Sequence, residues 1–437
     1  MRNWQVSVGN SPVVLGFDFG GTKIATAVCD LKGNRLASAT VCTGAGTGAP
    51  AAGEPGAAGP DPAGPDGDRG AQAIFGRGIQ AARDLLAASA PGRELAAVGA
   101  ATFGIPFEDR VELAPAIDGW ESLALGRELR AAFEGAEVRM ATDAKAAATA
   151  EVRWGALNGC DPGVYLNLGT GLAAAIVIGG QVVSGGNGAA GEIGYNLRAV
   201  SDVGRSLGQR MPLEDVVSGQ GLARQASSHR AGRPGSGRRG PGGSGRAGDV
   251  PAESALAGPG PGGSGLAGYG LSGPGHGGPG DGGPPDHTAG QLTAEDIFAA
   301  APGDPELDEL VTSFVNELAF HLVNLTICIN PVRISVGGGM VRSWARIRPQ
   351  LEQALRAGVP YPPELVVAQF PYDAPLLGAV ALAVDAAQGR GEPDRAAQDA
   401  VPARASPVAG AGPAAGTTVH LSMDTMYQNT MIQDTRV

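Results

Sequence analysis

Three short glycine turns lie between segments predicted to be strands, and each has the composition of a phosphate-binding loop. Their sequences are DFGGTK at 18–23, LGTGL at 168–172 and VGGGM at 336–340. Glycine has no Cβ, so backbone N–H groups in such turns can approach phosphate oxygens, and the threonines of the first two turns add a hydroxyl donor. The third turn ends a buried strand and opens a helix, whose N-terminus favours anions. Each turn alone is more often an ordinary turn, but the three in this order predict a nucleotide site.

Two aspartates stand at the ends of predicted strands. Asp18 follows the first apolar run, where its carboxylate could hold Mg²⁺ directly or through water. Asp143 opens an alanine-rich segment that is predicted to be a helix, and Thr142 is placed to cap that helix. A carboxylate at a helix start stays ionised at neutral pH because the helix dipole favours negative charge there. The alternative for Asp143 is a helix-terminal acid without a chemical role.

The pattern of apolar residues predicts the elements that must position these groups. A three-strand meander is predicted over 13–43 and a hairpin over 163–168 and 172–178, because β-branched residues there are separated by glycine turns. Further strands are predicted at 95–102, 137–141, 332–336 and 364–369. Helices are predicted at 71–89, 143–158, 306–329, from about 341, and at 375–388. Meanders followed by alternating strands and helices are typical of an α/β protein with two sheets.

Composition excludes several classes of protein. The net charge of −11 argues against sequence-independent binding of nucleic acid, which depends on a basic surface. No apolar run approaches the ~20 residues that span a bilayer, and the first ten residues lack the apolar core of a secretory signal. The four cysteines are scattered without CxxC spacing, which indicates neither a disulfide framework nor a structural zinc site. We therefore expect a cytoplasmic protein that binds neither nucleic acid nor membranes.

Glycine is concentrated in two stretches. Of the 72 glycines in 437 residues, 23 fall in 231–290 and nine in 44–70. Segments with so few large apolar residues cannot offset the entropy cost of ordering. The insertions 44–70 and 228–290 are therefore predicted to be disordered, and so is the weakly patterned tail 391–437.

Taken together, these segments resemble the ROK family (repressors, open reading frames and sugar kinases) of the actin-like ATPase superfamily. The similar stretches are LGFDFGGTKIATAV, FGIPFEDRVE, TDAKAAATAE, LNLGTGLAAAIVIGG, GAAGEIGY, LEDVVSGQGLAR, CINPVRISVGGGM and LLGAVALA. The resemblance implies a two-domain actin-like ATPase (ribonuclease H-like) fold with an interdomain cleft. The domains would be a small N-terminal α/β domain (13–141), a large α/β domain (142–374) and a C-terminal helix (375–390) that returns to the small domain.

The resemblance also implies roles for individual residues. Asp143 would be the general base that takes the proton of the acceptor hydroxyl, which typically contributes ~10²–10⁴ in rate. Glu192 and Glu214 would bind sugar hydroxyls, and the backbone of Gly104 would lie near the sugar. Asp18 would hold Mg²⁺, and ATP would lie against the three turns, at Gly20, Gly21, Thr22, Lys23, Gly169, Thr170, Gly171, Gly337, Gly338 and Gly339.

This chain departs from the family pattern at three places. Thr142 stands where the family usually has Asn before the catalytic Asp, and Tyr195 stands where it usually has His. The run VSDVGRSLGQRMPLED lacks the cysteines of the zinc-binding stretch, so the chain resembles a zinc-less member. Without zinc, we expect Arg205 and Arg210 to hold this loop by pairing with acids. Thr142 and Tyr195 would then be altered substrate-binding positions.

These observations predict an ATP-dependent kinase for the primary hydroxyl of a hexose or a hexose-like ring, similar to glucokinase. The altered positions keep an amino sugar or a C7 cyclitol of an antibiotic-type biosynthetic pathway as an alternative. A sugar-responsive repressor or a non-catalytic sugar-binding module is the alternative of another class. Only twelve residues precede the first predicted strand, too few for the DNA-binding segment that such repressors carry. The partners expected are a small-molecule sugar or cyclitol and, by resemblance, a second copy in a homodimer.

Overall fold

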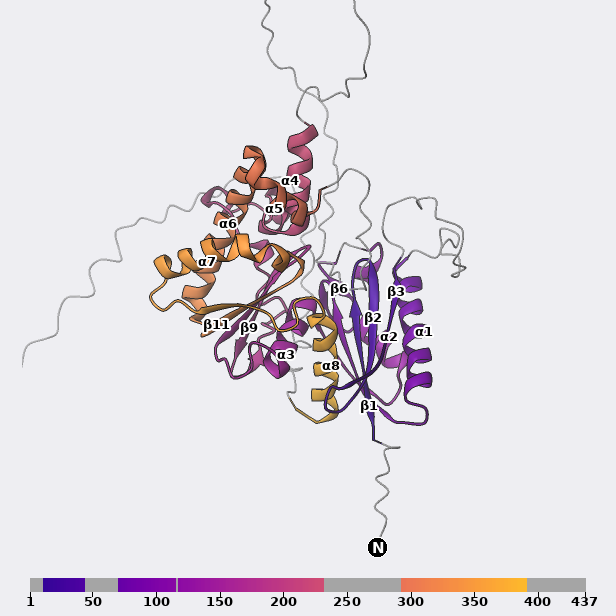
Figure 1. The fold of residues 1–437 in the computed structure, drawn as a ribbon. Helices are drawn as coiled ribbons and strands as arrows, with labels where there is room; N and C mark the ends of the chain where they lie inside the picture. The colour runs from indigo at the N-terminus through magenta and orange to yellow at the C-terminus, as the bar shows by residue number, and fades with distance from the viewer. Residues whose placement is uncertain (1–10, 44–69, 115–116, 232–291, 391–437) are drawn as a thin grey trace, which may run out of the picture. The chain divides into compact units, whose positions relative to one another are not determined.

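Two five-stranded sheets form the core of the molecule in a computed structural model that describes residues 11–43, 70–114, 117–231 and 292–390 (Figure 1). The N-terminal sheet has the order β3-β2-β1-β4-β7, with β1 parallel to β4 and β4 parallel to β7. The first three strands form the antiparallel meander that the sequence predicts. The strands are β1 (Val13–Phe19), β2 (Lys23–Asp30), β3 (Arg35–Cys42), β4 (Leu95–Thr102) and β7 (Glu137–Thr142).

The C-terminal sheet has the order β10-β9-β8-β11-β12, in which β8 pairs antiparallel with β9 and parallel with β11. Its strands are β8 (Gly163–Leu168), β9 (Leu172–Ile178), β10 (Gln181–Val182), β11 (Arg333–Gly337) and β12 (Glu364–Val367). A small ribbon, β5 (Ile105–Pro106) with β6 (Val111–Glu112), follows β4. The α/β architecture with two sheets is thus confirmed.

Helices cover both faces of each sheet. Alternate residues of β1 pack against α1 (Ala71–Ser89) on one face and α8 (Ala374–Ala387) on the other, as Figure 1 shows for the two helices. In the C-terminal sheet, α3 (Asp143–Trp154) covers one face. The opposite face is buried under α4 (Gly219–Ala231), α5 (Ala294–Ala300), α6 (Pro305–Ile329) and α7 (Trp344–Gly358). The remaining helix, α2 (Leu125–Ala132), joins the core of the N-terminal sheet.

Glycines let α8 pack against both the N-terminal sheet and α3. A Cβ at Gly99 of β4 would lie 1.8 Å from the carbonyl oxygen of Ala379, and one at Gly378 would lie 1.8 Å from that of Ala146 on α3. Both positions therefore require glycine because backbone meets backbone there. The two helices join the cores of the two sheets through small residues.

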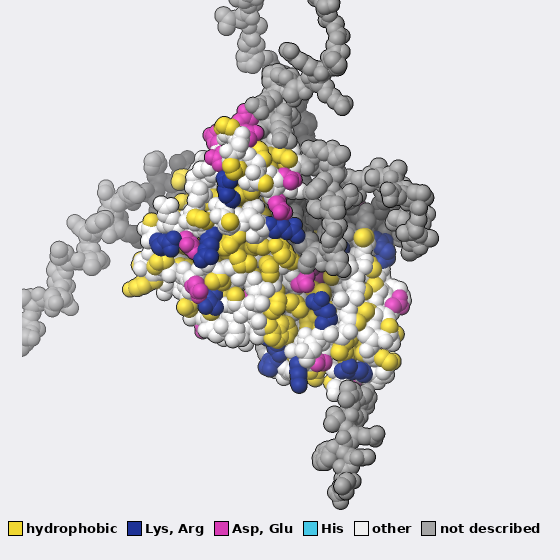
Figure 2. All heavy atoms as spheres, viewed as in Figure 1, with side chains coloured by type: hydrophobic (Ala, Val, Ile, Leu, Met, Phe, Trp, Pro, Cys, Tyr) yellow, Lys and Arg dark blue, Asp and Glu magenta, His cyan; other side chains and the backbone are white. Residues whose placement is uncertain are grey.

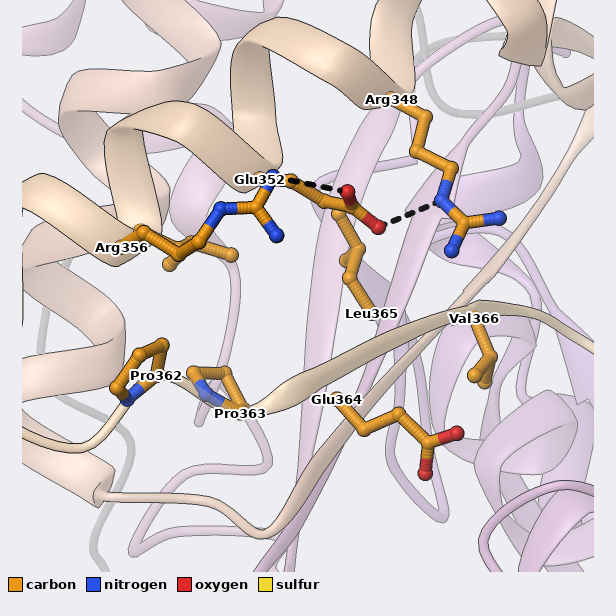
Figure 3. A pocket seen from close by; sticks show the side chains of 9 residues that line it. Arg348, Glu352, Arg356, Pro362, Pro363, Glu364, Leu365 and Val366 are labelled. Atoms are coloured by element: carbon orange, nitrogen blue, oxygen red, sulfur yellow. Dashed lines mark hydrogen bonds and ion pairs between the residues drawn. The ribbon is translucent and has the colours of Figure 1, made fainter.

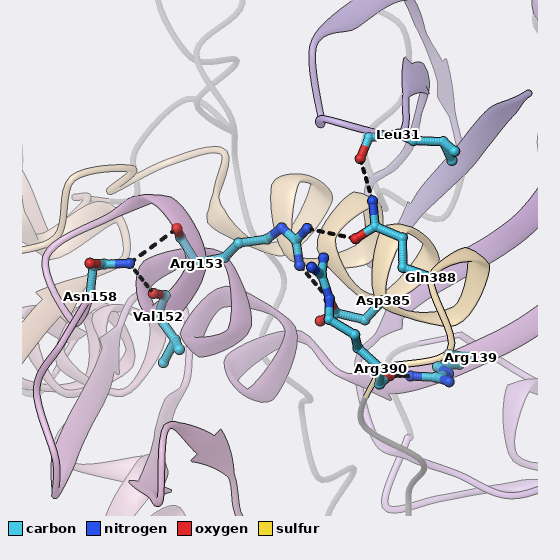
Figure 4. A network of polar contacts seen from close by, with 8 residues as sticks. All are labelled: Leu31, Arg139, Val152, Arg153, Asn158, Asp385, Gln388 and Arg390. Atoms are coloured by element: carbon cyan, nitrogen blue, oxygen red, sulfur yellow. Dashed lines mark hydrogen bonds and ion pairs between the residues drawn. The ribbon is translucent and has the colours of Figure 1, made fainter. Parts of the chain in front are cut away.

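A polar network secures the other end of this helix pair (Figure 4). Arg153 on α3 pairs with Asp385 on α8 and also contacts the Gln388 side chain at 3.5 Å. The Gln388 amide donates to the carbonyl of Leu31 at 2.9 Å, and Arg139 of β7 donates to the carbonyl of Arg390. The network thus links α3, α8 and two strands of the N-terminal sheet.

Most predicted elements lie within a few residues of the observed ones, with instructive differences. The helix predicted over 143–158 ends at Trp154, because Gly155 takes an extended conformation. The helices α2, α4 and α5 and the short strands β5, β6 and β10 were not predicted, since they carry weak apolar patterns. The insertions 44–70 and 228–290 lie, except for their edges, outside the described residues, and the tail 391–437 lies outside them entirely; α4 extends to Ala231.

The helix α6 is the one described helix long and apolar enough to cross a membrane by composition. Half of its most apolar window is buried in the protein, and Val311, Phe314 and Leu318 lie in the core of the C-terminal half. This pattern is that of a core helix in a globular protein. On the face in Figure 2, basic and acidic side chains are interspersed.

Candidate functional site

The carboxyl ends of three parallel strands bring Asp18 and Asp143 to one edge of the N-terminal sheet. Asp18 pairs with Ala101 of β4, and Ala101 pairs with Ala141 of β7, two residues before Asp143. Neighbouring strands are about 5 Å apart, so the ends of β1 and β7 are separated by roughly 10 Å. Ligands of open α/β sheets bind at this kind of edge. Gly104, with a φ of 77°, turns the chain directly after β4 at the same edge.

Asp143 begins α3 and is almost completely buried, with 3% of its surface exposed. Thr142 caps the helix by accepting from the backbone N–H of Lys145 at 3.4 Å, as the sequence predicts. The Oδ1 atom of Asp143 accepts from the N–H of Ala144 at 2.6 Å. This carboxylate therefore lies at the positive end of the dipole of α3.

Lys145, one turn into α3, forms an ion pair with Glu192. Its Nζ lies 3.2 Å from Oε1 of Glu192, and the two side chains are 5% and 20% exposed. Burial raises the pKa of Glu192 above its usual value, the positive charge of Lys145 opposes that rise, and the negative charge of Asp143 adds to it. The three side chains thus form one electrostatic cluster at the start of α3.

Glu214 extends this cluster to the second glycine turn. Its Oε2 accepts from the backbone N–H of Leu172, the residue that follows Gly171, at 2.8 Å. Burial is the largest of the causes that together raise the pKa of Glu214 to about 7; the charges of Asp143, Asp215 and Glu192 add to the rise, and the hydrogen bond from Leu172 opposes it. A group with this pKa changes charge in the neutral range, which is frequent at functional sites.

Tyr195 is a further polar side chain in this region and ends a single turn of 3₁₀ helix, η3 (Ile193–Tyr195). Burial raises the pKa of its phenol, and Glu214, Glu192 and Glu121 add to the rise. The phenol therefore stays neutral at physiological pH and can both donate and accept a hydrogen bond. The structure thus brings Asp143, Glu192, Tyr195 and Glu214 within electrostatic reach of one another.

The second and third glycine turns meet at one edge of the C-terminal sheet. Gly337 pairs with Asn167, so both turns follow the carboxyl ends of neighbouring parallel strands. A Cβ at Gly338, whose φ is 93°, would lie 2.4 Å from the carbonyl oxygen of Leu168 and 2.8 Å from the nitrogen of Gly169. Gly219, at the start of α4, donates to the carbonyl of Gly169 at 2.8 Å. Backbone from three segments therefore packs together in one small region.

The first glycine turn is fixed by the end of the meander. Gly20 donates to the carbonyl of Lys23 at 3.0 Å, which closes the turn. Thr43 donates through its backbone to Thr22 at 2.9 Å and through its hydroxyl to the carbonyl of Gly21 at 2.8 Å. This turn lies at the Asp143 edge of the N-terminal sheet.

The loop between Tyr195 and Glu214 is held mainly by arginines, but not in the predicted way. Arg210 donates to the backbone carbonyls of Tyr195 and Asn196, rather than pairing with an acid. Arg198 forms the acidic pair instead, with Glu317 of α6. No side-chain partner of Arg205 is found in the described parts of the chain. Within those parts, no three His, Cys, Asp or Glu side chains are grouped as metal ligands.

A surface pocket between α7 and β12 is a separate feature (Figure 3). Arg348 and Arg356 line it, and both pair with Glu352, at 2.6 and 3.2 Å. Its positive charges are therefore already partly balanced, and none of the sequence-predicted site residues line it.

Sequence reasoning missed Lys145, although a hint was present. Only three of the 32 basic residues are lysines, and this one interrupts a run of alanines directly after Asp143. A lysine on an alanine-rich helix usually faces solvent, and only the fold brings Glu192 within reach of it.

The comparison with protein families agrees with this geometry. The model of the ROK family matches residues 78–386, which is more than half of the chain. The chain therefore belongs to the ROK family, and the resemblance of the sequence motifs is confirmed.

Individual relatives include several sugar kinases. A glucokinase from Streptomyces coelicolor is 31% identical over 225 residues, which is 51% of this chain and 61% of that protein. A kanosamine kinase from Amycolatopsis mediterranei is 32% identical over 137 residues, or 31% of this chain and 44% of that one. The aligned region thus spans less than two thirds of the length of each of these relatives.

Among solved structures, a ROK family glucokinase from Streptomyces griseus in complex with glucose and AMPPNP has a TM-score of 0.54 and 24% identity. The match covers 84% of this chain and 98% of that structure. The chain therefore has the actin-like ATPase fold of the ROK kinases, as the resemblance implied.

Proposed function

We propose that this protein is an ATP-dependent kinase that phosphorylates the primary hydroxyl of a hexose or hexose-like ring. The observation that carries the proposal is the cluster of Asp143, Glu192, Tyr195 and Glu214, which joins the start of α3 to the strand that follows the second glycine turn. Buried carboxylates are costly unless they are paired or hydrogen-bonded, and several that face one another are frequent at functional sites. The sugar kinases among the relatives support the same reaction class.

In this proposal the sugar hydroxyl gives its proton to Asp143 while its oxygen attacks the γ-phosphorus, and ADP leaves. The N-terminus of α3 places its positive dipole end beside the Asp143 carboxylate. Glu192 and Glu214 accept hydrogen bonds from ring hydroxyls, which are the stronger for being charge-assisted. The rest of the rate enhancement in phosphoryl transfer comes from positioning the reacting groups and from neutralising the charge of the phosphates.

The phosphates would be bound by the backbone of the glycine turns, with the first turn on one sheet and the second and third on the other. Asp18 is suited to Mg²⁺, because this ion keeps several waters and needs only one or two carboxylates besides the phosphates. Bound Mg²⁺ would neutralise charge on the transferred phosphoryl group. Gly104 would contact the sugar through its backbone.

The acceptor is proposed to be glucose or a close relative of it, with amino sugars and C7 cyclitols as alternatives. Thr142 offers a hydroxyl that is already engaged in the helix cap, and Tyr195 offers a neutral phenol. Sites that hydrogen-bond a substrate can reject analogues lacking the partner group by up to ~10⁴–10⁵. The cytoplasmic location, the homodimer and the division into domains at 13–141, 142–374 and 375–390 remain part of the proposal.

The test is an assay of turnover with ATP and Mg²⁺ on glucose, kanosamine, mannose, N-acetylmannosamine and valiolone-type cyclitols. We expect turnover of at least one compound, and turnover of none would defeat the proposal. Binding of a sugar without any turnover would favour the non-catalytic sugar-binding module.

A variant assigns the base. Asp143→Asn should lower kcat at least a hundredfold, because it removes the proton acceptor. ATP binding should stay near normal, because the side chain keeps almost the same volume. Asp84→Asn, on the exposed face of α1, is the matched control and should leave kcat unchanged. A fall of less than tenfold in Asp143→Asn would remove Asp143 from the role.

A further inference from the structure

Lys145 lies inside the cluster of carboxylates that the proposed function uses, and its position has a consequence for the choice of substrate. The residue belongs to the first turn of α3 and is 4% exposed. The other two lysines of the chain, Lys23 and Lys32, lie outside the core, on β2 and in the turn after it. A buried ammonium ion is stable only with a partner, and the partner in this structure is Glu192, at 3.2 Å.

We propose that Lys145 is a specificity-determining residue that keeps Glu192 a hydrogen-bond acceptor for sugar hydroxyls and disfavours protonated amino groups beside it. The inference rests on the proposed sugar-binding role of Glu192. It commits to neutral hydroxyl-bearing sugars rather than amino sugars as the preferred substrate class.

The charge of Glu192 depends on its neighbours. The groups that face it are Lys145 and Asp143 from α3, Tyr195 from η3, and Glu214. Lys145 is the cation in this group. Without it, burial and the charge of Asp143 would favour the protonated form of Glu192. A protonated Glu192 would offer a donor in place of one of its acceptor sites.

A positively charged substrate group at Glu192 would also meet the charge of Lys145. A substrate ammonium ion that bound Glu192 would stand beside the ammonium ion of Lys145, with little water between them. Like charges a few ångströms apart repel strongly in a protein interior, and such a built-in repulsion is a common source of specificity. A neutral hydroxyl at the same place meets no such cost.

The experiment compares kcat/KM for glucose with that for glucosamine and kanosamine at a pH where the amines are protonated. The wild-type protein should prefer glucose at least tenfold. Lys145→Met should shift this ratio at least tenfold toward the amino sugars, whereas Lys145→Arg keeps the positive charge and should keep the preference. Lys32→Met, in an exposed turn, is the matched control. A ratio within twofold of wild type in Lys145→Met would overturn the proposal.

Two further measurements separate this inference from the kinase proposal and from misfolding. Calorimetric binding of the same sugars reports the preference without turnover, so the inference can stand or fall even if no phosphate is transferred. With only three lysines, the ammonium resonances of ¹⁵N-lysine-labelled protein can be assigned individually. The Lys145 resonance should change in Glu192→Gln, and an unchanged resonance would overturn the proposal even if Lys145→Met does not fold.

Discussion

The first and last turns of α3 each carry one acidic and one basic residue, but these residues have different roles. At the first turn, Asp143 and Lys145 form a cluster with Glu192, a side chain of a distant loop. Toward the last turn, Glu151 binds backbone N–H groups and Arg153 binds the neighbouring helix α8. Burial does not separate the two ends, since Asp143 and Glu151 are 3% and 0% exposed. The partners distinguish the two ends. The residues of the first turn contact side chains of the candidate substrate site, whereas Glu151 and Arg153 contact backbone N–H groups and the neighbouring helix α8.

Glu151 shows the structural kind of buried charge most clearly. Its two carboxylate oxygens accept from the backbone N–H groups of Ala156, Gln369 and Phe370, at 2.7, 3.1 and 2.8 Å. The carboxylate therefore ties the end of α3 to the segment between β12 and α8. One carboxylate thus accepts from three backbone donors of two separate segments.

The largest effect on stability is expected from Glu151→Ala. The substitution removes the acceptor of three N–H groups, and hydrogen bonds to a charged group contribute roughly 1.5–3 kcal/mol each. We expect the free energy of unfolding to fall by about 3 kcal/mol or more, measured by urea denaturation, with kcat of the folded fraction within a few-fold of wild type.

Two variants control this measurement. Glu151→Gln keeps an acceptor oxygen and should lose less stability than Glu151→Ala. Glu134→Ala removes an exposed glutamate and should be neutral. If Glu151→Ala were as stable as the wild type but lost kcat, the contrast between the two ends of α3 would be wrong.

Much of the fold could be predicted because its determinants are local. The glycine turns, the β-branched strands and the Thr142 cap each act within a few residues. The end of α3 was misplaced by four residues because its stop depends on the conformation of Gly155 and on contacts to Glu151. Neither can be read from apolar spacing.

The candidate roles of Glu192 and Glu214 came only from the family resemblance, and the pairings of these side chains could not be predicted. Glu192 lies 47 residues from Lys145, and Glu214 lies 42 residues from Leu172. No periodicity links such positions. The expectation that Arg210 pairs with an acid failed for the same reason, because a guanidinium satisfies backbone carbonyls equally well when a loop turns around it.

A smaller effect is expected from pH at the functional end. Burial raises the pKa of Glu214 to about 7 from an ordinary 4.5, so the folded protein binds a proton that the unfolded chain has lost. Its contribution to stability is therefore fully present below pH 4.5 and is lost as the pH rises to about 7. Sugar binding by the carboxylate should change the other way, strengthening up to tenfold per pH unit until about pH 7.

This expectation is checked by calorimetric binding of glucose between pH 5.5 and 8.5. Glu214→Gln cannot titrate, so it should flatten both the binding profile and its part of the pH dependence of unfolding. A wild-type binding profile that is already flat through pH 7 would show that this carboxylate does not act as an acceptor for the sugar.

The smallest effect is expected at the structural end, from the pair Arg153–Asp385 that joins α3 to α8 (Figure 4). The two side chains are 20% and 24% exposed, so solvent weakens their attraction, and such pairs contribute about 0.2–1 kcal/mol. A double-mutant cycle with Arg153→Ala and Asp385→Ala should give a coupling energy in this range, and added salt should reduce it. Because Arg153 lies eight residues along the helix from Lys145 and ten from Asp143, kcat and the pH profile of sugar binding should be unchanged. If these substitutions changed the pH profile of sugar binding, the position of α8 would affect the first turn of α3. The proposed difference in role between the two ends of α3 would then be wrong.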